Sequence, residues 1–350
     1  MLNQDLPENR YIDCLLLDLE REVEQWSIER PVSSIFIGGG TPSLFSPAAF
    51  SRLFAGIQRS LTLAETAEIT LEANPGTFES EKFKEFRATG INRLSIGIQS
   101  FDSLLLQQLG RVHNGAEAIK AAEIAHQAGF TNFNLDLMFG LPHSTAAQSA
   151  LDVTTAISLA PSHISFYQLT LEPNTLFYKF PPPLPDDEHI FQTQQQCQEL
   201  LQQTNYLQYE ISAYSRPGKQ CQHNLNYWRF GDYLGIGAGA HGKITLQRPN
   251  HIIRTLKPKH PEHYLQQMPS SMTTIPLQEL PVEFLMNQLR LKQGFSLTHF
   301  QQQTGLGLSA LEPALSQCVQ AKLLSISGDN CICTEQGWNF LDAVLEKFIP

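Results

Sequence analysis

Glycine and polar residues recur where predicted strands end, and they are of the kinds that bind a small charged ligand. The first such place is Gly38–Gly40, which follows the apolar run Ile35–Ile37, read as a buried strand, and leads into Thr41. Consecutive glycines permit unusual backbone angles and let a ligand approach the bare backbone. No Gly-Lys-Ser/Thr follows, and the spacing is not that of a dinucleotide fingerprint. Neither a P-loop nor a Rossmann site is therefore predicted.

Four later strand ends also carry polar groups. They are Glu72, Gln99 with Arg111 in the following loop, Asp136 and Thr170. Each one alone is explained equally well as a capped strand end or a surface ion pair. Together with the glycines they suit a ligand that has an ammonium, a carboxylate and ribose hydroxyls, because carbonyls accept from ammonium and arginine binds carboxylate bidentately. S-adenosylmethionine has this set of groups.

The elements that must position these residues alternate between helices and strands. Helical apolar spacing predicts helices over 10–26 and 47–60, and Asn114 with Glu117 forms a capping box at the start of another. Strands are predicted at 35–37, 68–76, 93–101, 132–138 and 163–170. This order predicts a parallel sheet, curved or closed into a barrel, with functional groups at the carboxyl ends of its strands.

The second half of the chain has a different character. A proline-rich break at 180–185 precedes a glutamine-rich helix that ends near residue 203 and one strand at 209–213. From residue 281, three helices, a hairpin over 323–333 and a final helix follow in the order of a winged helix. This region has four Lys/Arg against six Asp/Glu, so we expect it to pack against protein and not to bind DNA.

Composition sets the class of protein. The formal net charge of −10 argues against a nucleic-acid or anionic-membrane partner. The opening residues are polar, and no apolar run reaches membrane-spanning length, so we expect a cytoplasmic protein that does not span a membrane. The six scattered cysteines fit free thiols in a reducing compartment.

Six motifs carry a family resemblance. They are GGGTPS, LEANPG, SIGIQSF, LGRVH, NLDLMFGLP and QLTLEPNT, in this order and spacing. Over nearly its whole length the chain resembles the radical S-adenosylmethionine (SAM) family of oxygen-independent coproporphyrinogen III oxidases. The resemblance implies an α/β fold, a partial TIM-like (β/α)6 barrel with parallel strands and a C-terminal accessory domain. It also implies bound SAM and a [4Fe–4S] cluster. Carried over by position, the SAM-binding residues would be Gly39, Gly40, Thr41, Glu72, Gln99, Arg111 and Asp136, with Thr170 and His241 as weaker matches.

A later run resembles the heme-chaperone branch of this family. Residues 221–228 read CQHNLNYW and contain its H-N-x-x-Y-W motif. The resemblance implies that His223, Asn224, Tyr227 and Trp228 contact heme, with His223 as the candidate axial ligand. A lone histidine is more often a hydrogen-bonded structural residue, so this assignment depends on the family match. The implied partners are heme and a heme-receiving protein, with a membrane respiratory protein as the candidate acceptor.

The cluster motif of the family is missing from the sequence. The family holds its cluster with C-x-x-x-C-x-x-C in a loop after the first barrel strand, upstream of the helix at 10–26. Neither that strand nor those cysteines are present, and Cys14 alone cannot hold a cluster. Either the chain begins downstream of the true start or the cluster has been lost. The intact pocket residues favour a late start, and we expect a barrel that lacks its first strand.

Three functions follow from the resemblance. The first is a heme chaperone built on a radical SAM scaffold, which the H-N-x-x-Y-W run and the 235–242 segment favour. The alternative is an oxygen-independent coproporphyrinogen III oxidase, whose activity we do not expect in this chain, and the third is an inactive remnant without a cluster. The expected regions are a radical SAM barrel at 1–180, a linker and heme-contact segment at 181–280, and a winged-helix-like domain at 281–350.

Overall fold

The computed structural model describes residues 7–77, 80–246 and 250–349. The chain divides into two compact units, and each is described here by itself. The barrel unit comprises Ser33–Ser51 and Glu65–Cys221, and the C-terminal unit comprises Met1–Val32, Arg52–Ala64 and Gln222–Pro350. No helix within the described ranges is long and apolar enough to cross a bilayer.

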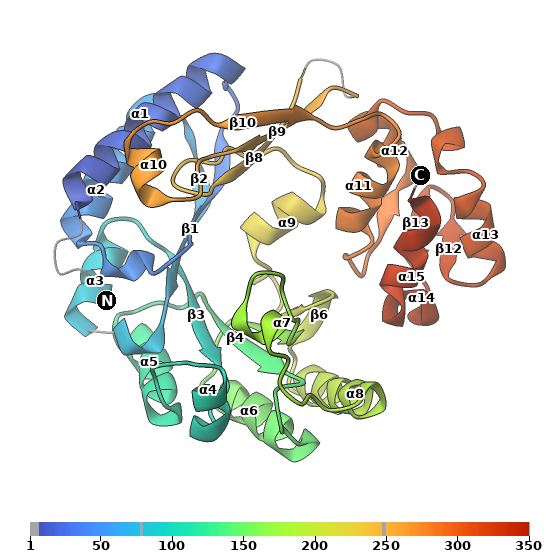
Figure 1. Cartoon of the computed structure of the whole chain (residues 1–350), viewed down its shortest axis with the longest axis horizontal. Coiled ribbons are helices and arrows are strands. Elements are labelled where there is room, and N and C mark those ends of the chain that lie inside the picture. Colours follow the sequence, from blue (N-terminus) through green and yellow to red (C-terminus); the bar gives the residue numbers. More distant parts are fainter. Residues whose placement is uncertain (1–6, 78–79, 247–249, 350) are drawn as a thin grey trace. The chain divides into compact units, whose positions relative to one another are not determined.

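The barrel unit is built on a curled sheet of seven strands in the order β1-β2-β3-β4-β5-β7-β6 (Figure 1). The strands are β1 Val32–Ile37, β2 Leu63–Ala73, β3 Arg93–Gln99, β4 Phe133–Phe139, β5 His163–Gln168, β6 Leu207–Glu210 and β7 Ala213–Ser215. Strands β2 to β5 pair in parallel, each with the next, which confirms the predicted curved parallel sheet. The sheet and its connecting helices are an open α/β half-barrel, as the family resemblance implied.

Two expectations about these strands are wrong. The single strand predicted at 209–213 is an antiparallel hairpin of β6 and β7, because the chain turns at Ile211 and Ser212. The strand β1 is half-buried along most of its length instead of buried, because it lies at the edge of the sheet.

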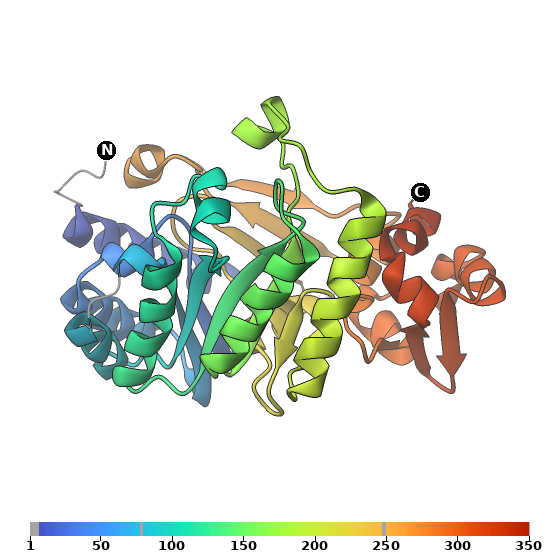
Figure 2. The same cartoon turned by 90° about the horizontal axis from the view of Figure 1, so that it is seen from below.

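Helices connect the strands. They are α2 Pro47–Ser60, α3 Ser80–Ala88, α4 Ser103–Gln108, α5 Gly115–Gln127, α6 Ala146–Ser158, α7 Leu176–Lys179 and α8 Asp187–Gln203. Of these, α5, α6 and α8 lie along one face of the sheet, while α7 stands beyond its edge (Figure 2). The predicted capping box of Asn114 and Glu117 begins α5, and Thr145 with Gln148 forms a second one at α6. The short helices α4 and α7 were not predicted.

The two faces of the sheet have different chemistry because side chains alternate along each strand. Leu94, Ile96 and Leu135 are fully buried among apolar neighbours. Ser95 and Asn134 alternate with them and hydrogen-bond to each other across β3 and β4 at 2.9 Å. The second face is therefore a polar layer inside the curved sheet.

The C-terminal unit begins with the amphipathic helix α1, Glu8–Trp26, as predicted. Its buried acidic side packs against an antiparallel sheet of β8 His241–Thr245, β9 Ile252–Leu256 and β10 Ser271–Thr274, which was not predicted. Lys257, only 4% exposed at its side chain, pairs with Asp18 at 2.6 Å and Glu22 at 2.5 Å. This buried ion-pair cluster fastens α1 to the end of β9. The helices α9 Gln222–Trp228 and α10 Pro261–Leu265 complete this part.

The last third of the C-terminal unit has the predicted winged-helix order. The elements are α11 Leu280–Gln288, β11 Phe295–Ser296, α12 Leu297–Thr304, α13 Ala314–Gln320, β12 Leu324–Ser327, β13 Asn330–Cys333, α14 Glu335–Asn339 and α15 Leu341–Leu345. Their core gathers around Phe284, which contacts Phe295 and Phe300 edge-on at about 5 Å between ring centroids. The predicted final helix is divided in two at Phe340. In the described part of the chain, short 3-10 helices lie at Pro42–Leu44 and Pro75–Thr77 in the barrel unit and at Leu308–Leu311 and Glu346–Phe348 in the C-terminal unit.

Candidate functional site

The glycine run after β1 is held in place by Glu72 near the end of β2. Gly39 and Gly40 have φ angles of +84° and +67°, in the left-handed region that favours glycine. The Gly39 N–H donates to Glu72 Oε2 at 3.0 Å. A Cβ added to Gly38 would lie 2.8 Å from the Glu72 carboxyl carbon, so only glycine allows this close approach. The first two predicted strand ends are thus brought together.

Thr41 continues the same edge of the sheet. Asn74, just after β2, donates from Nδ2 to Thr41 Oγ1 at 3.3 Å. This bond links the loop after β1 to the loop after β2. Thr41 therefore lies beside the end of β2, the strand that carries Glu72, as the sequence predicted.

Gln99 ends β3 in a strained conformation. Its φ is +70°, which costs a non-glycine residue on the order of 1–3 kcal/mol. The side chain is 4% exposed, and its Oε1 accepts from the Tyr167 hydroxyl at 2.8 Å. Tyr167, on β5, was not predicted as a site residue. The signal for it was the alternation of β5, in which Ser165 and Tyr167 share the polar face.

Tyr167 shows that the charged candidates lie around one place. Burial raises the pKa of Tyr167, and the charges that act on it are those of Asp136, Arg111 and Glu72. Burial also raises the pKa of Glu72, an effect that the Gly39 N–H opposes and the Asp136 charge reinforces. Two neighbouring, partly desolvated carboxylates favour a cationic ligand.

Asp136 lies deeper in the sheet than expected. It is the fourth residue of β4, opposite Ser165 of β5, and not at the strand end. Asn134 Nδ2 donates to its Oδ1 at 2.8 Å and Ser95 Oγ to its Oδ2 at 3.3 Å. Burial raises the pKa of Asp136, and the hydrogen bond from Asn134 opposes that rise. Asp136 is therefore a carboxylate of the inner polar layer, set back from the carboxyl ends of the strands.

Three predicted residues differ from this group in their exposure or in the unit to which they belong. Thr170 is exposed, two residues beyond the end of β5. Arg111 is an exposed residue of the loop after α4, although its charge acts on Tyr167. His241 is the first residue of β8 and belongs to the C-terminal unit, unlike the other cofactor candidates.

A hydrogen-bonded chain that the sequence did not reveal runs through the polar layer. Asn134 Nδ2 donates to Asp136, so its Oδ1 is free to accept from His163 Nδ1 at 2.7 Å. His163 Nε2 then accepts from the Tyr209 hydroxyl at 2.8 Å, and the Cys221 N–H donates to Tyr209 at 3.3 Å. Burial lowers the pKa of His163 well below its ordinary value, which keeps the ring neutral. The chain thus joins β4, β5 and β6 to the residue that precedes α9.

The residues around the glycine loop fit SAM, but none fits an iron–sulfur cluster. A Cβ built on Gly39 or Gly40 would meet no atom within 4 Å in the described structure, so the loop is open to a ligand. The carboxylates of Glu72 and Asp136 complement a sulfonium and an ammonium. Within residues 7–77, 80–246 and 250–349, no group of three His, Cys, Asp or Glu side chains is placed to hold a metal ion.

The candidate heme motif lies on the short helix α9. His223 and Tyr227, four residues apart, share one face and have ring centroids 4.6 Å apart. Tyr227 also contacts Tyr233 edge-on at 4.4 Å, and Trp228 lies 6.5 Å from Tyr227. Asn224, the fourth candidate, is half-buried on the same helix. The sequence placed these residues in one motif, although it did not show that they form a helix.

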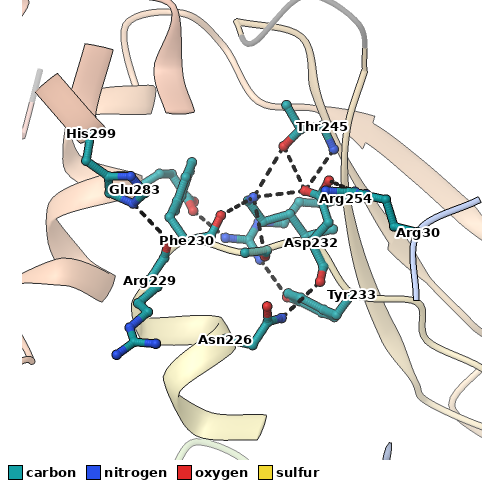
Figure 3. Close-up of polar contacts among 12 residues, drawn as sticks. Arg30, Asn226, Arg229, Phe230, Asp232, Tyr233, Thr245, Arg254, Glu283 and His299 are labelled. Carbon is teal, nitrogen blue, oxygen red and sulfur yellow. Dashed lines mark hydrogen bonds and ion pairs between the residues drawn. The ribbon is translucent and has the colours of Figure 1, made fainter. Parts of the chain in front are cut away.

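The end of α9 is fixed by a buried lysine. Lys243 Nζ donates to the Phe230 carbonyl at 2.9 Å, pairs with Asp232 at 3.3 Å and lies 4.0 Å from the centre of the Phe230 ring. Figure 3 shows Thr245 converging on the same Asp232 carboxylate, to which it donates from its amide and its hydroxyl. Asn226 of α9 donates to the Asp232 carbonyl at 2.9 Å. The ammonium therefore supplies the donors that the carbonyls after a helix end need.

Comparison with known proteins places this geometry in context. The Radical SAM superfamily model matches residues 12–150, and the HemN C-terminal domain model matches residues 275–340. The chain is 45% identical to the heme chaperone HemW of Escherichia coli (strain K12), over 99% of this chain and 92% of that protein. It is 32% identical to the heme chaperone HemW of Bacillus subtilis (strain 168), over 95% and 89%. Among solved structures, coproporphyrinogen III oxidase (HemN) from Escherichia coli superposes with a TM-score of 0.80 at 20% identity, covering 99% of this chain and 84% of that one, which shows a shared fold.

Proposed function

The chain belongs to the HemW family of heme chaperones in the radical SAM superfamily, and we propose that it binds heme and transfers it to an acceptor protein. The observation that carries this proposal is α9, where His223, Tyr227 and Trp228 lie together and Lys243 holds the helix end. The likeness to coproporphyrinogen III oxidase supports the fold alone, at 20% identity. It therefore does not favour the oxidase alternative over the chaperone.

The imidazole of His223 is the proposed axial ligand of the heme iron. Tyr227 and Trp228 offer flat apolar surface to the porphyrin, whose burial contributes about 25 cal/mol per Å² of apolar area. Asn224 lies one residue beyond the ligand on the same helix and is proposed as a polar contact. Heme is here the cargo of the protein.

A titration with ferric heme tests this assignment. His223→Ala should shift the Soret band and weaken binding, because the iron loses its ligand. Trp228→Ala should weaken binding with less change in the band, and His241→Ala, the matched histidine control, should leave the band unaltered. A His223→Ala protein with an unchanged Soret band and unchanged affinity would remove the ligand assignment.

SAM is the proposed cofactor of the barrel unit. The backbone of the glycine loop would contact it at Gly39, Gly40 and Thr41. Its ammonium and hydroxyls would donate hydrogen bonds to Glu72, Gln99 and Asp136. Arg111 would pair with its carboxylate, and Thr170 and His241 are the peripheral candidates. In radical SAM relatives SAM acts together with a [4Fe–4S] cluster as a source of radicals. The described residues supply no ligand set for that cluster, so no step is assigned to it.

We further propose a cytoplasmic location, with a heme-receiving membrane respiratory protein as acceptor. The six cysteines are all free thiols, which fits a reducing compartment. As functional regions we propose residues 1–180 for the cofactor scaffold, 181–280 for heme contact and 281–350 for the winged-helix-like module.

A further inference from the structure

A guanidinium group stacks on the tryptophan of the candidate heme motif. Arg290, which follows the end of α11, has its Cζ 4.3 Å from the centre of the Trp228 ring. Helices α9 and α11 pack against each other within the C-terminal unit, so this contact belongs to one compact body. Arg229 follows Trp228 directly and is exposed. Arg290 therefore lies on the ring that is proposed to face the porphyrin, and Arg229 comes directly after that ring's residue in the chain.

The neighbouring carboxylates are already engaged by other cations. Glu283 of α11 is ion-paired with Arg254 of β9. Asp232 is ion-paired with Lys243 and with Arg30. Figure 3 shows the Arg229 guanidinium pointing away from these contacts. The acidic residues beside α9 thus have partners of their own, in a chain whose net charge is −10.

The chemistry of heme complements this arrangement. Heme carries two propionate groups, which are ionised at neutral pH as ordinary carboxylates are. Arginine can stack its flat face on an aromatic ring and still present its edge N–H groups to a carboxylate. A bidentate guanidinium–carboxylate pair adds orientation as well as affinity.

We propose that Arg290, with Arg229 as a second cation, binds the propionate carboxylates of heme whose ring lies against Tyr227 and Trp228. This inference rests on the proposed heme binding and gives the site a means of orienting the porphyrin. It also makes the site selective for porphyrins with free carboxylates.

The test compares two ligands that differ only at the propionates: iron protoporphyrin IX and its dimethyl ester. The unmodified protein should bind the free acid at least about tenfold more tightly than the ester, as expected for charge-assisted hydrogen bonds. Arg290→Gln should lose most of that preference through weaker binding of the acid, with little change for the ester. Its Soret band should stay the same because His223 is untouched, and Arg229→Gln should show a smaller loss of preference.

Lys292→Gln is the matched control. Lys292 is a second cation over a tryptophan, 5.3 Å from the Trp338 ring centre, and lies two residues from Arg290. Its loss should leave the acid-to-ester ratio unchanged. Equal affinity of the unmodified protein for acid and ester would overturn this inference and leave heme binding intact. An Arg290→Gln protein that loses both ligands equally would also overturn it, because the arginine would then act only on Trp228. Failure of the unmodified protein to bind either ligand would instead overturn the proposed function.

Discussion

Lys243 binds the segment that follows α9, the helix of the candidate heme motif. Its side chain is 3% exposed, and burial lowers its pKa while the Asp232 charge opposes that shift. Asp232 and the Phe230 carbonyl replace the water that the ammonium has lost.

Replacing this lysine should destabilise the C-terminal unit. Lys243→Met would remove the ammonium from Asp232, which keeps the exposed Arg30 and Thr245 as partners, and would take away the donor to the Phe230 carbonyl. The expected cost is about 1–3 kcal/mol in the free energy of unfolding. Lys120→Met removes the lysine of an exposed pair with Glu123 and should cost less than about 1 kcal/mol. Urea denaturation of both variants measures the difference. Equal losses in the two would show that Lys243 does not hold α9.

Asp152 couples stability to pH. It lies on α6 and accepts from Ser100 Oγ at 2.6 Å and the Phe101 N–H at 2.7 Å, just beyond Gln99. Burial raises its pKa to about 6, an effect that the Ser100 hydrogen bond opposes. Because the folded state holds this proton more tightly than the unfolded state, the stabilising contribution is present at low pH. It is lost as pH rises through about 6.

Asp152→Asn should remove that dependence. Between pH 4 and pH 7 the free energy of unfolding of the unmodified protein should fall relative to that of Asp152→Asn. The fall should be about 3 kcal/mol at most. Denaturation profiles across this range measure the difference between the two proteins. Parallel profiles would contradict the assignment of the shifted carboxyl to Asp152.

At the scale of elements, the sequence predicted those helix and strand boundaries that are set by residues close together in the chain. The start of α5 was predictable because Asn114 and Glu117 satisfy each other's backbone groups. The strand β10 was not, because all of its residues are exposed and carry no alternating pattern. The hairpin of β6 and β7 lacks glycine, proline, asparagine and aspartate at its turn, so nothing in the sequence marked it.

The sequence predicted which residues form the candidate cofactor site, but not how far along its strand each one lies. Glu72 and Gln99 lie near strand ends as predicted, since β2 ends at Ala73 and β3 ends at Gln99. Asp136 lies mid-strand because the register of β4 against β5 sets its level, and sequence does not show register. His163 and Tyr209 were missed because their partners come from different strands.

Tyr209 tests the chain that joins those strands. Tyr209→Phe would remove the hydroxyl that hydrogen-bonds to two buried groups, His163 Nε2 and the Cys221 N–H. The loss should lower the free energy of unfolding by about 2–4 kcal/mol. The control is Tyr206→Phe, since Tyr206 is also buried but its hydroxyl donates to the Pro161 carbonyl, outside this chain of hydrogen bonds. Its expected cost is about half as large. Thermal denaturation compares them, and a Tyr209→Phe protein no less stable than the control would refute a continuous chain.

At the scale of the whole molecule, two compact units carry different chemistry. The barrel unit gathers the proposed SAM residues except His241, and the C-terminal unit carries the heme motif with the cations around it. The fold class could be predicted because the family motifs span nearly the whole chain. That α1 and α9 belong to the same unit could not be predicted, because it depends on contacts between distant segments, such as that of Lys257 with Glu22.

Heme transfer tests the chaperone function most directly. Protein loaded with stoichiometric ferric heme would be mixed with membranes that contain a heme-free respiratory cytochrome, and the cytochrome absorption bands would be followed over time. The account predicts that the bands appear faster from the loaded protein than from the same amount of free heme. It also predicts that the advantage is lost with His223→Ala. Heme that stays on the protein, or an acceptor that fills equally fast from free heme, would contradict the account.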